Sequence, residues 1–124
     1  MLPRFPLTGA LNAQPLQPPP NPYGVAPQGA TISGPPGTFS IRPGAEVLVG
    51  RDPAQCGVML QEPRVSGVHA TLKFEQSQLW VRDETSNNGT YVAGMRIAAG
   101  VWTVISPGTP LRFGPIDFTV RLDT

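Results

Sequence analysis

From Ala30 onward the sequence consists of short apolar or alternating runs that are separated by turn residues about every eight to twelve positions. This spacing is typical of an all-β sandwich or barrel, because each run suits a strand and is too short for a packed helix. The breaks between the runs contain prolines and glycines, which favour turns. No segment keeps an apolar stripe at helical spacing, so the sequence predicts an almost helix-free domain.

Eleven of these runs are candidate strands. In residues 78–83, alternation places Leu79 and Val81 on one face and Trp80 and Arg82 on the other, as a half-buried strand requires. The runs are residues 30–33, 37–42, 46–50, 57–61, 69–75, 78–83, 90–94, 95–98, 101–105, 109–113 and 117–122. The residues expected in the core are Val47, Val49, Leu60, Leu72, Phe74, Leu79, Val81, Leu111, Phe113 and Phe118.

The first 29 residues differ in composition from the rest of the chain. Eight of the sixteen prolines lie there, and no charged side chain occurs between Arg4 and Arg42. Because proline fixes φ and removes a backbone donor, this stretch is expected to be extended and polyproline-like. We therefore predict a Pro-rich flexible tail or linker over residues 1–29 and one folded domain over residues 30–124. A spacer is the simpler interpretation of the tail, and a recruiting motif is the alternative.

Charge and rare residue types argue against several classes of function. Nine Lys and Arg against eight Asp and Glu give a net charge of +1, so no long-range field favours nucleic acid or a membrane as partner. The single cysteine, Cys56, and the single histidine, His69, leave too few ligands for a zinc site. No apolar run could span a bilayer, and Pro3 and Pro6 interrupt the first residues too early for a signal peptide. The sequence thus predicts a cytoplasmic protein without a metal or cofactor.

Three segments between predicted strands carry hydrogen-bond donors, namely residues 50–52, 64–69 and 85–90. Since each adjoins a strand, all three can lie in loops at one end of a sandwich, where binding residues usually sit. Together they offer a guanidinium, hydroxyls and carboxamides, with backbone N–H groups near Gly67 and Gly89 and no pair of carboxylates. Such donors suit a phosphate group, which brings three acceptor oxygens and about −1.5 to −2 charges at neutral pH.

The order of these segments resembles the forkhead-associated (FHA) domain family. The family pattern is G-R, then S-x-x-H about fifteen residues later, then S-x-N-G-T and a following glycine. The matching residues are Gly50-Arg51, Ser66-Gly67-Val68-His69, Ser86-Asn87-Asn88-Gly89-Thr90 and Gly94. Each motif alone is weak, but three in this order on an all-β chain form a strong signal. The resemblance implies an FHA-like β-sandwich of about eleven short, mostly antiparallel strands that binds phosphothreonine peptides and has no catalytic activity.

The resemblance also implies a role for each polar residue. Arg51 would be the main cation on the phosphate, and the Ser66 hydroxyl would donate a second hydrogen bond to it. The amide of Asn87 would reach the same oxygens. Asn88 would hold the peptide backbone beside the phosphothreonine.

Selectivity and support would come from other positions. Arg64 would read the peptide residue three positions after the phosphothreonine, where an acidic residue is expected. Gly67 departs from the family pattern, which often has arginine or asparagine there, and this removes one contact to the ligand. His69 would brace two loops through its ring. The other supporting residues would be Gly50, Gly89 and Thr90.

Two other functions stay open on the sequence. Ser66, His69 and Asp83 would be the nucleophile, base and orienting acid of a hydrolase, although a serine and histidine three apart offer no obvious geometry for proton transfer. No oxyanion hole is recognisable either. Alternatively, the domain would be a scaffold or assembly module that binds partners through a sheet face without phosphate, which the departure at Gly67 makes more plausible.

If the chain functions as the FHA resemblance implies, its expected partners are a protein or peptide that contains phosphothreonine and the Ser/Thr kinase that phosphorylates that threonine. The tail offers a second ligand in Thr8, within Pro6-Leu7-Thr8-Gly9. If a kinase phosphorylated Thr8, the domain could capture its own tail at the millimolar effective concentration of short linkers.

Overall fold

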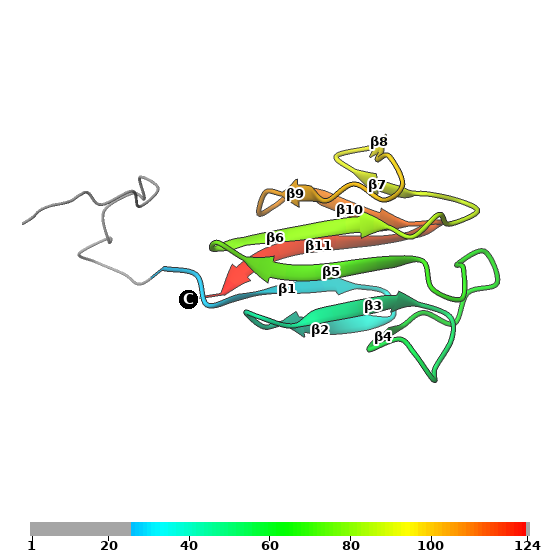
Figure 1. Ribbon diagram of the computed structural model, residues 1–124, viewed down its shortest axis with the longest axis horizontal. Helices are drawn as coiled ribbons and strands as arrows, with labels where there is room; N and C mark the ends of the chain where they lie inside the picture. The colour runs from blue at the N-terminus through cyan, green and yellow to red at the C-terminus, as the bar shows by residue number, and fades with distance from the viewer. Residues whose placement is uncertain (1–25, 124) are drawn as a thin grey trace, which may run out of the picture.

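The computed structural model describes residues 26–123, and these residues form eleven strands and no helix (Figure 1). Each run predicted to be a strand contains one, so the all-β prediction is confirmed. The strands are β1 Gly29–Gly34, β2 Gly37–Ile41, β3 Glu46–Gly50, β4 Val58–Met59, β5 Ala70–Glu75, β6 Gln78–Asp83, β7 Thr90–Val92, β8 Met95–Arg96, β9 Thr103–Ile105, β10 Pro110–Phe113 and β11 Ile116–Asp123. Nothing in this part of the chain forms a helix long and apolar enough to cross a membrane.

The strands form two sheets that lie face to face (Figure 1). The six-stranded sheet has the order β2-β1-β11-β10-β7-β8, and the five-stranded sheet has the order β4-β3-β5-β6-β9. All the pairs of neighbouring strands are antiparallel except β3 and β4, which run parallel. The prediction of a mostly antiparallel β-sandwich is therefore confirmed.

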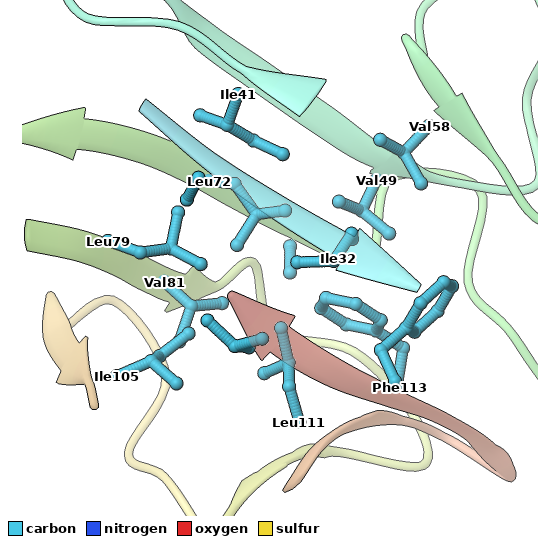
Figure 2. Close-up of a cluster of buried hydrophobic side chains, with 14 of the residues drawn as sticks. Ile32, Ile41, Val49, Val58, Leu72, Leu79, Val81, Ile105, Leu111 and Phe113 are labelled. Atoms are coloured by element: carbon cyan, nitrogen blue, oxygen red, sulfur yellow. The ribbon is translucent and has the colours of Figure 1, made fainter. Parts of the chain in front are cut away.

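One apolar core lies between the two sheets. Figure 2 shows Ile32 and Ile41 of the six-stranded sheet on the same cluster as Leu72 and Leu79 of the five-stranded sheet. Nine of the ten predicted core residues are buried, and Val47 is the exception because it is only partly buried. The cluster also includes buried residues that the sequence did not single out, namely Ile32, Ile41, Val58, Val65, Ile105 and Val120.

Several strands are shorter than predicted, and tertiary contacts explain why. β4 pairs only with the last two residues of β3. Val47 precedes them, so no strand pairs with it on the β4 side of β3. Leu60 N still donates to Gly50 O (2.8 Å), and the chain then turns at residues 62–65, where Val65 N donates to Glu62 O (2.9 Å). After β8, the amide of Gly100 donates to Asp83 O (2.9 Å), which brings the chain across to the five-stranded sheet.

The connections that carry the predicted site residues leave the sandwich at one end. The β3–β4, β4–β5 and β6–β7 loops lie at the right-hand end in Figure 1, opposite the C-terminus. β1 begins at Gly29, one residue before the expected domain boundary. The predicted tail lies largely outside the described residues, as does Thr8, so the interpretation of the tail stays a prediction.

Candidate functional site

Two of the three loops are joined by their backbones. Arg51 N donates to Ser66 O at 3.0 Å, and Asp52 N donates to Gly67 O at 3.1 Å. The side chain of Arg51 also contacts the β4–β5 loop, because its Nε donates to Val65 O at 3.2 Å. Its exposed terminal amino groups make no hydrogen bond to another residue within 26–123. The structure thus holds Arg51 and Ser66 side by side, with the outer part of a guanidinium directed to solvent.

Gly50 makes this close contact of the two loops sterically feasible. A Cβ atom at Gly50 would lie 2.2 Å from Gly67 O and 2.9 Å from the Sγ atom of Cys56. The thiol of Cys56 in turn donates to Gly67 O at 3.2 Å. Only glycine fits at a position where another backbone approaches this closely, which gives a physical reason for the residue before Arg51.

The third loop contacts Ser66 and Arg64. Asn87 N donates to the Oγ atom of Ser66 at 3.1 Å. Because that oxygen acts as the acceptor, the hydroxyl proton of Ser66 remains available for an anion. The side-chain amide of Asn88 donates to Arg64 O at 2.7 Å, which leaves its Oδ1 atom as an acceptor at the surface. The three loops therefore meet around Ser66.

His69 connects the β4–β5 and β6–β7 loops from the buried side. Its side chain is fully buried, Nδ1 accepts a hydrogen bond from Ser66 N at 3.1 Å, and Nε2 lies 2.8 Å from Gly89 O. Since Ser66 N can only donate, the neutral ring carries its proton on Nε2 and donates to Gly89 O. Burial lowers the pKa of His69, while the hydrogen bond to Gly89 and the charge of Asp83 act in the opposite direction. This arrangement is the one that a bracing role requires.

Asp83, at the end of β6, organises the β6–β7 loop. Its Oδ1 atom accepts hydrogen bonds from the hydroxyls of Ser86 (2.5 Å) and Thr90 (2.7 Å), and its Oδ2 atom accepts one from Ser86 N (3.0 Å). The Ser86 hydroxyl oxygen also accepts from Gly89 N (3.0 Å). Burial raises the pKa of Asp83, but these hydrogen bonds outweigh it and the pKa lies below its ordinary value.

These contacts leave no catalytic relay among Ser66, His69 and Asp83. Both ring nitrogens of His69 are engaged with backbone groups, and the carboxylate of Asp83 is engaged with Ser86 and Thr90. The Ser66 hydroxyl contacts Asn87 N instead of the imidazole. The hydrolase hypothesis therefore receives no support from the geometry.

Some contacts at this end of the sandwich involve residues that the sequence did not single out for the site. Gly114 N donates to Gly89 O at 2.9 Å, and a Cβ at Gly114 would lie 3.1 Å from Arg64 O. A Cβ at Gly89 would lie 2.6 Å from the Nε atom of Arg96, so a further exposed guanidinium rests against this loop. Gly114 directly follows the expected strand of residues 109–113, where a glycine is a signal for a turn. Arg96 had no such signal, because β8 reaches the loop only through the pairing of β7 and β8.

Arg64 has a different environment from Arg51. The Oε1 atom of Glu62 accepts hydrogen bonds from Arg64 Nε (2.9 Å) and Arg64 N (3.1 Å). The pKa of the Glu62 carboxyl lies below its ordinary value chiefly because of this side-chain bond. A carboxylate of the protein thus already contacts the guanidinium that was expected to read an acidic peptide residue.

A rim of donors on a rigid β-sandwich, with its one histidine engaged by backbone groups, defines a recognition module. A family model described as FHA domain matches residues 47–114, which is more than half of the chain. The chain therefore belongs to the FHA domain family. The match runs from β3 to Gly114 and so includes all three loops of the site. As a family, FHA domains are known as phosphothreonine-binding modules.

Solved FHA domains share the fold. The FHA domain of the CT664 protein from Chlamydia trachomatis is 22% identical, with a TM-score of 0.69 over 77% of this chain and 98% of that chain. The FHA-1 domain of Rv1747 from Mycobacterium tuberculosis is 24% identical, with a TM-score of 0.68 over 80% of this chain and 100% of that chain. The MEK1 FHA domain, solved in complex with a HOP1 phosphothreonine peptide, is 24% identical, with a TM-score of 0.68 over 81% and 100%.

Proposed function

We propose that this domain binds protein segments that contain phosphothreonine, and that it does so at the rim formed by the three loops. The observation that carries the proposal is that Arg51 is held next to Ser66, because its backbone N donates to Ser66 O at 3.0 Å and its Nε donates to Val65 O at 3.2 Å. Arginine and hydroxyl donors to a phosphate form charge-assisted hydrogen bonds, which are about twice as strong as neutral ones.

The neighbouring residues take complementary roles. The exposed amide of Asn87 lies next to Ser66 and would add a donor to the same phosphate. Asn88 is oriented by Arg64 O, and its free Oδ1 atom would accept a backbone N–H of the peptide. Gly67 has open space at its Cβ position, so it contributes room and no side-chain contact. The γ-methyl of threonine would add about 0.8 kcal/mol over serine if it were buried at the rim.

This function requires a Ser/Thr kinase that produces the ligand, and so we place the protein in the cytoplasm as a non-catalytic component of kinase signalling. The ligand is either a segment of a partner protein or the protein's own Thr8, if it is phosphorylated. A phosphorylated full-length chain would then bind added phosphopeptide more weakly than the same chain without residues 1–29. Equal affinities of the two chains would argue against capture of the tail.

Binding through a sheet face without phosphate is the second candidate function, and one observation favours it. The partly exposed indoles of Trp80, in β6, and Trp102, the residue before β9, lie near Lys73 of β5, whose Nζ is 4.2 Å from the ring centre of Trp102. Aromatic residues of this kind are enriched at protein interfaces. Trp80 and Lys73 align with Glu46 at the start of β3, whereas Arg51 follows the end of β3, so substitution of Arg51 separates the two functions.

The decisive experiment measures the affinity of an oriented phosphothreonine peptide library, and then of single peptides, for the wild-type chain and for Arg51→Ala. We expect low-micromolar binding, about −8 kcal/mol, for the wild type. Loss of hydrogen bonds to a charged group should weaken Arg51→Ala by about 10-fold to 100-fold. Arg42→Ala removes a similar exposed charge at the other end of the sandwich and should bind as the wild type does.

The unphosphorylated form of each peptide provides the second control. Equal binding of the phosphorylated and unphosphorylated forms would refute the proposal. If Arg51→Ala then also kept that binding, the sheet face would be the better candidate.

A further inference from the structure

Among the residues that the structure describes, the exposed large apolar side chains all belong to one segment, which runs from β8 to β9. They are Met95, Val101 and Val104, whose side chains are 74%, 54% and 39% exposed. β8 is the last strand of the six-stranded sheet, β9 is the last strand of the five-stranded sheet, and both lie along the same side of the sandwich (Figure 1). We name this side, formed by residues 95–105, the β8–β9 edge.

The β8–β9 edge lacks the features that usually keep the edge of a sheet from pairing with another chain. Charged residues and prolines are the common protection of an edge strand, and neither occurs from Ile97 to Ile105. The guanidinium of the preceding residue, Arg96, lies against Gly89 of the β6–β7 loop. Residues 98–101 are small or apolar and are all exposed, and a run of this kind usually serves a contact.

The other two edges of the sandwich are different. β2 ends the six-stranded sheet on the opposite side, and its exposed residues are Thr38 and Ser40, which carry hydroxyls. Prolines also flank β2 on both sides. β4 ends the five-stranded sheet, has two residues and exposes neither. Of the four edges formed by the described strands, the β8–β9 edge therefore has the most apolar exposed surface.

The apolar surface continues from this edge onto the outer face of the five-stranded sheet. Val104 lies directly opposite Trp80 of β6, so both side chains are on the same face. Trp102, which precedes β9, is partly exposed next to them. The cations that lie over its ring, Lys73 and Arg82, each form a salt bridge with a nearby glutamate. The surface around β9 is therefore apolar, and the charges beside it are paired.

The chemistry of this surface fits a second copy of the same chain. A charged partner would find no charge from Ile97 to Ile105 with which to pair, whereas an identical neutral edge can approach without repulsion between like charges. A two-fold contact joins the same patch of both copies, closes at two and covers both open edges. We propose that two copies associate through their β8–β9 edges about a two-fold axis.

The arrangement of the dimer follows from the pairing of its edges. Two copies of one strand that are related by a two-fold axis share ladder hydrogen bonds when they run antiparallel, so the two β9 strands are antiparallel. β6 is antiparallel to β9 and ends at the proposed phosphate site, which puts the two sites at opposite ends of the dimer. If phosphothreonine binds there as proposed, the dimer would link two phosphorylated chains. The association itself does not depend on phosphate.

The test is sedimentation velocity of the unphosphorylated full chain from about 1 μM to about 500 μM. The edge is smaller than the roughly 20–30 residues that a standard interface has on each side, so we expect a dimer with a Kd of roughly tens of micromolar. Val104→Lys and Val101→Lys each add a charge that meets its own copy across the contact. Each should weaken the dimer about ten-fold or more, and two positions are used in case one variant fails to fold.

Thr38→Lys is the matched control, since it adds the same charge to the exposed face of the β2 edge and should leave the dimer unchanged. Urea unfolding curves show which variants are folded. A wild type that stays monomeric over the whole range would overturn the inference, even if the edge bound a different protein. Equal weakening by Thr38→Lys, or no weakening by either valine substitution, would overturn it too.

The dimer and the proposed phosphothreonine site fail separately. All three lysine variants should bind a phosphothreonine peptide as the wild type does, because none of the substituted residues belongs to the three loops of the site. A dimer that binds no phosphopeptide would refute the proposed function and support this inference. Phosphopeptide binding by a chain that is always monomeric would do the reverse.

Discussion

The imidazole of His69 joins Ser66 to Gly89, accepting from the amide of Ser66 at 3.1 Å and donating to the carbonyl of Gly89 at 2.8 Å. The two partners are backbone groups of different loops, so the ring sets the spacing between the proposed phosphate donors. A second proton on the ring would place an N–H group opposite Ser66 N–H. The loops therefore keep this geometry only while His69 is neutral.

This requirement predicts how stability depends on pH. The pKa of His69 is lowered by burial below its ordinary 6.5, so the unfolded chain binds the proton more readily than the folded chain. The contribution of His69 is complete above pH 6.5 and is lost as the pH falls through 6.5 toward the folded-state pKa. Urea unfolding at pH values from about 8 to about 5 should show a falling free energy of unfolding.

The chain contains one histidine, which makes the result easy to assign. The carboxyl groups with lowered pKa values, such as Asp83 and Asp123, lose their contributions only below about pH 4. An NMR titration of the imidazole should give a pKa below 6.5. A free energy of unfolding that stays constant through this range would contradict the neutral bridging role of His69.

Gly50→Ala should damage the site and the fold together, because its new methyl group would lie 2.2 Å from the backbone oxygen of Gly67. Overpacking of this kind typically costs about 1–3 kcal/mol in the free energy of unfolding. Gly67→Ala is the matched control, since a Cβ at Gly67 meets no atom within 4 Å and should change stability by less than about 0.5 kcal/mol. Comparable losses from both substitutions would show that the loops are not packed as described.

Asp83→Asn should strongly destabilise the domain. Asparagine keeps the shape but puts an NH₂ group in place of one oxygen, so at least one of the donors from Ser86 and Thr90 loses its acceptor. Loss of buried hydrogen bonds to a charged group should lower the free energy of unfolding by about 2–3 kcal/mol. The carboxylate acts when ionised, so the difference from the wild type should shrink as the pH falls below about 4. A difference that stays the same at low pH would contradict this account.

The fold could be predicted because its determinants are local. Alternation places Leu79 and Val81 inside β6, and turn residues separate the strands at regular intervals. The ends of strands depend on partners that local patterns do not reveal. β4 has two residues because it pairs with β3 only at Val49 and Gly50. The apolar pattern of residues 57–61 does not indicate this limit.

The sequence predicted that Arg51, Ser66 and Asn87 lie together at one end of the sandwich, but it did not predict most of their contacts. The positions of Arg51 and Ser66 after and before predicted strands indicated that both lie at one end of the sandwich. The structure places them there and joins them by a backbone hydrogen bond. The sequence offered Asp83 only as the acid of a hydrolase, whereas the structure has it as the centre of a buried loop network. The pairing of Glu62 with Arg64 also depends on how the β4–β5 loop turns, which no spacing rule specifies.

Asn87 and Asn88 are adjacent in the sequence, but they should respond differently to substitution. The side-chain amide of Asn88 donates to Arg64 O at 2.7 Å, so Asn88→Ala removes a bond between two loops. Its free energy of unfolding should fall by about 1 kcal/mol. Asn87 contacts Ser66 through its backbone amide, which alanine retains, so Asn87→Ala should change stability by less than about 0.5 kcal/mol.

The two substitutions should also differ in how they weaken peptide binding. Both substitutions should weaken a phosphothreonine peptide, but Asn87→Ala should lose the part of the affinity that depends on phosphate, about five-fold to ten-fold for one hydrogen bond. Asn88→Ala should weaken binding because the peptide backbone loses its acceptor and because the Arg64 segment is no longer held in place. Peptide affinities measured beside urea unfolding curves for both variants give all four values. A stability loss in Asn87→Ala that equals the loss in Asn88→Ala would show that the two amides share one structural role, and would remove Asn87 from the proposed phosphate site.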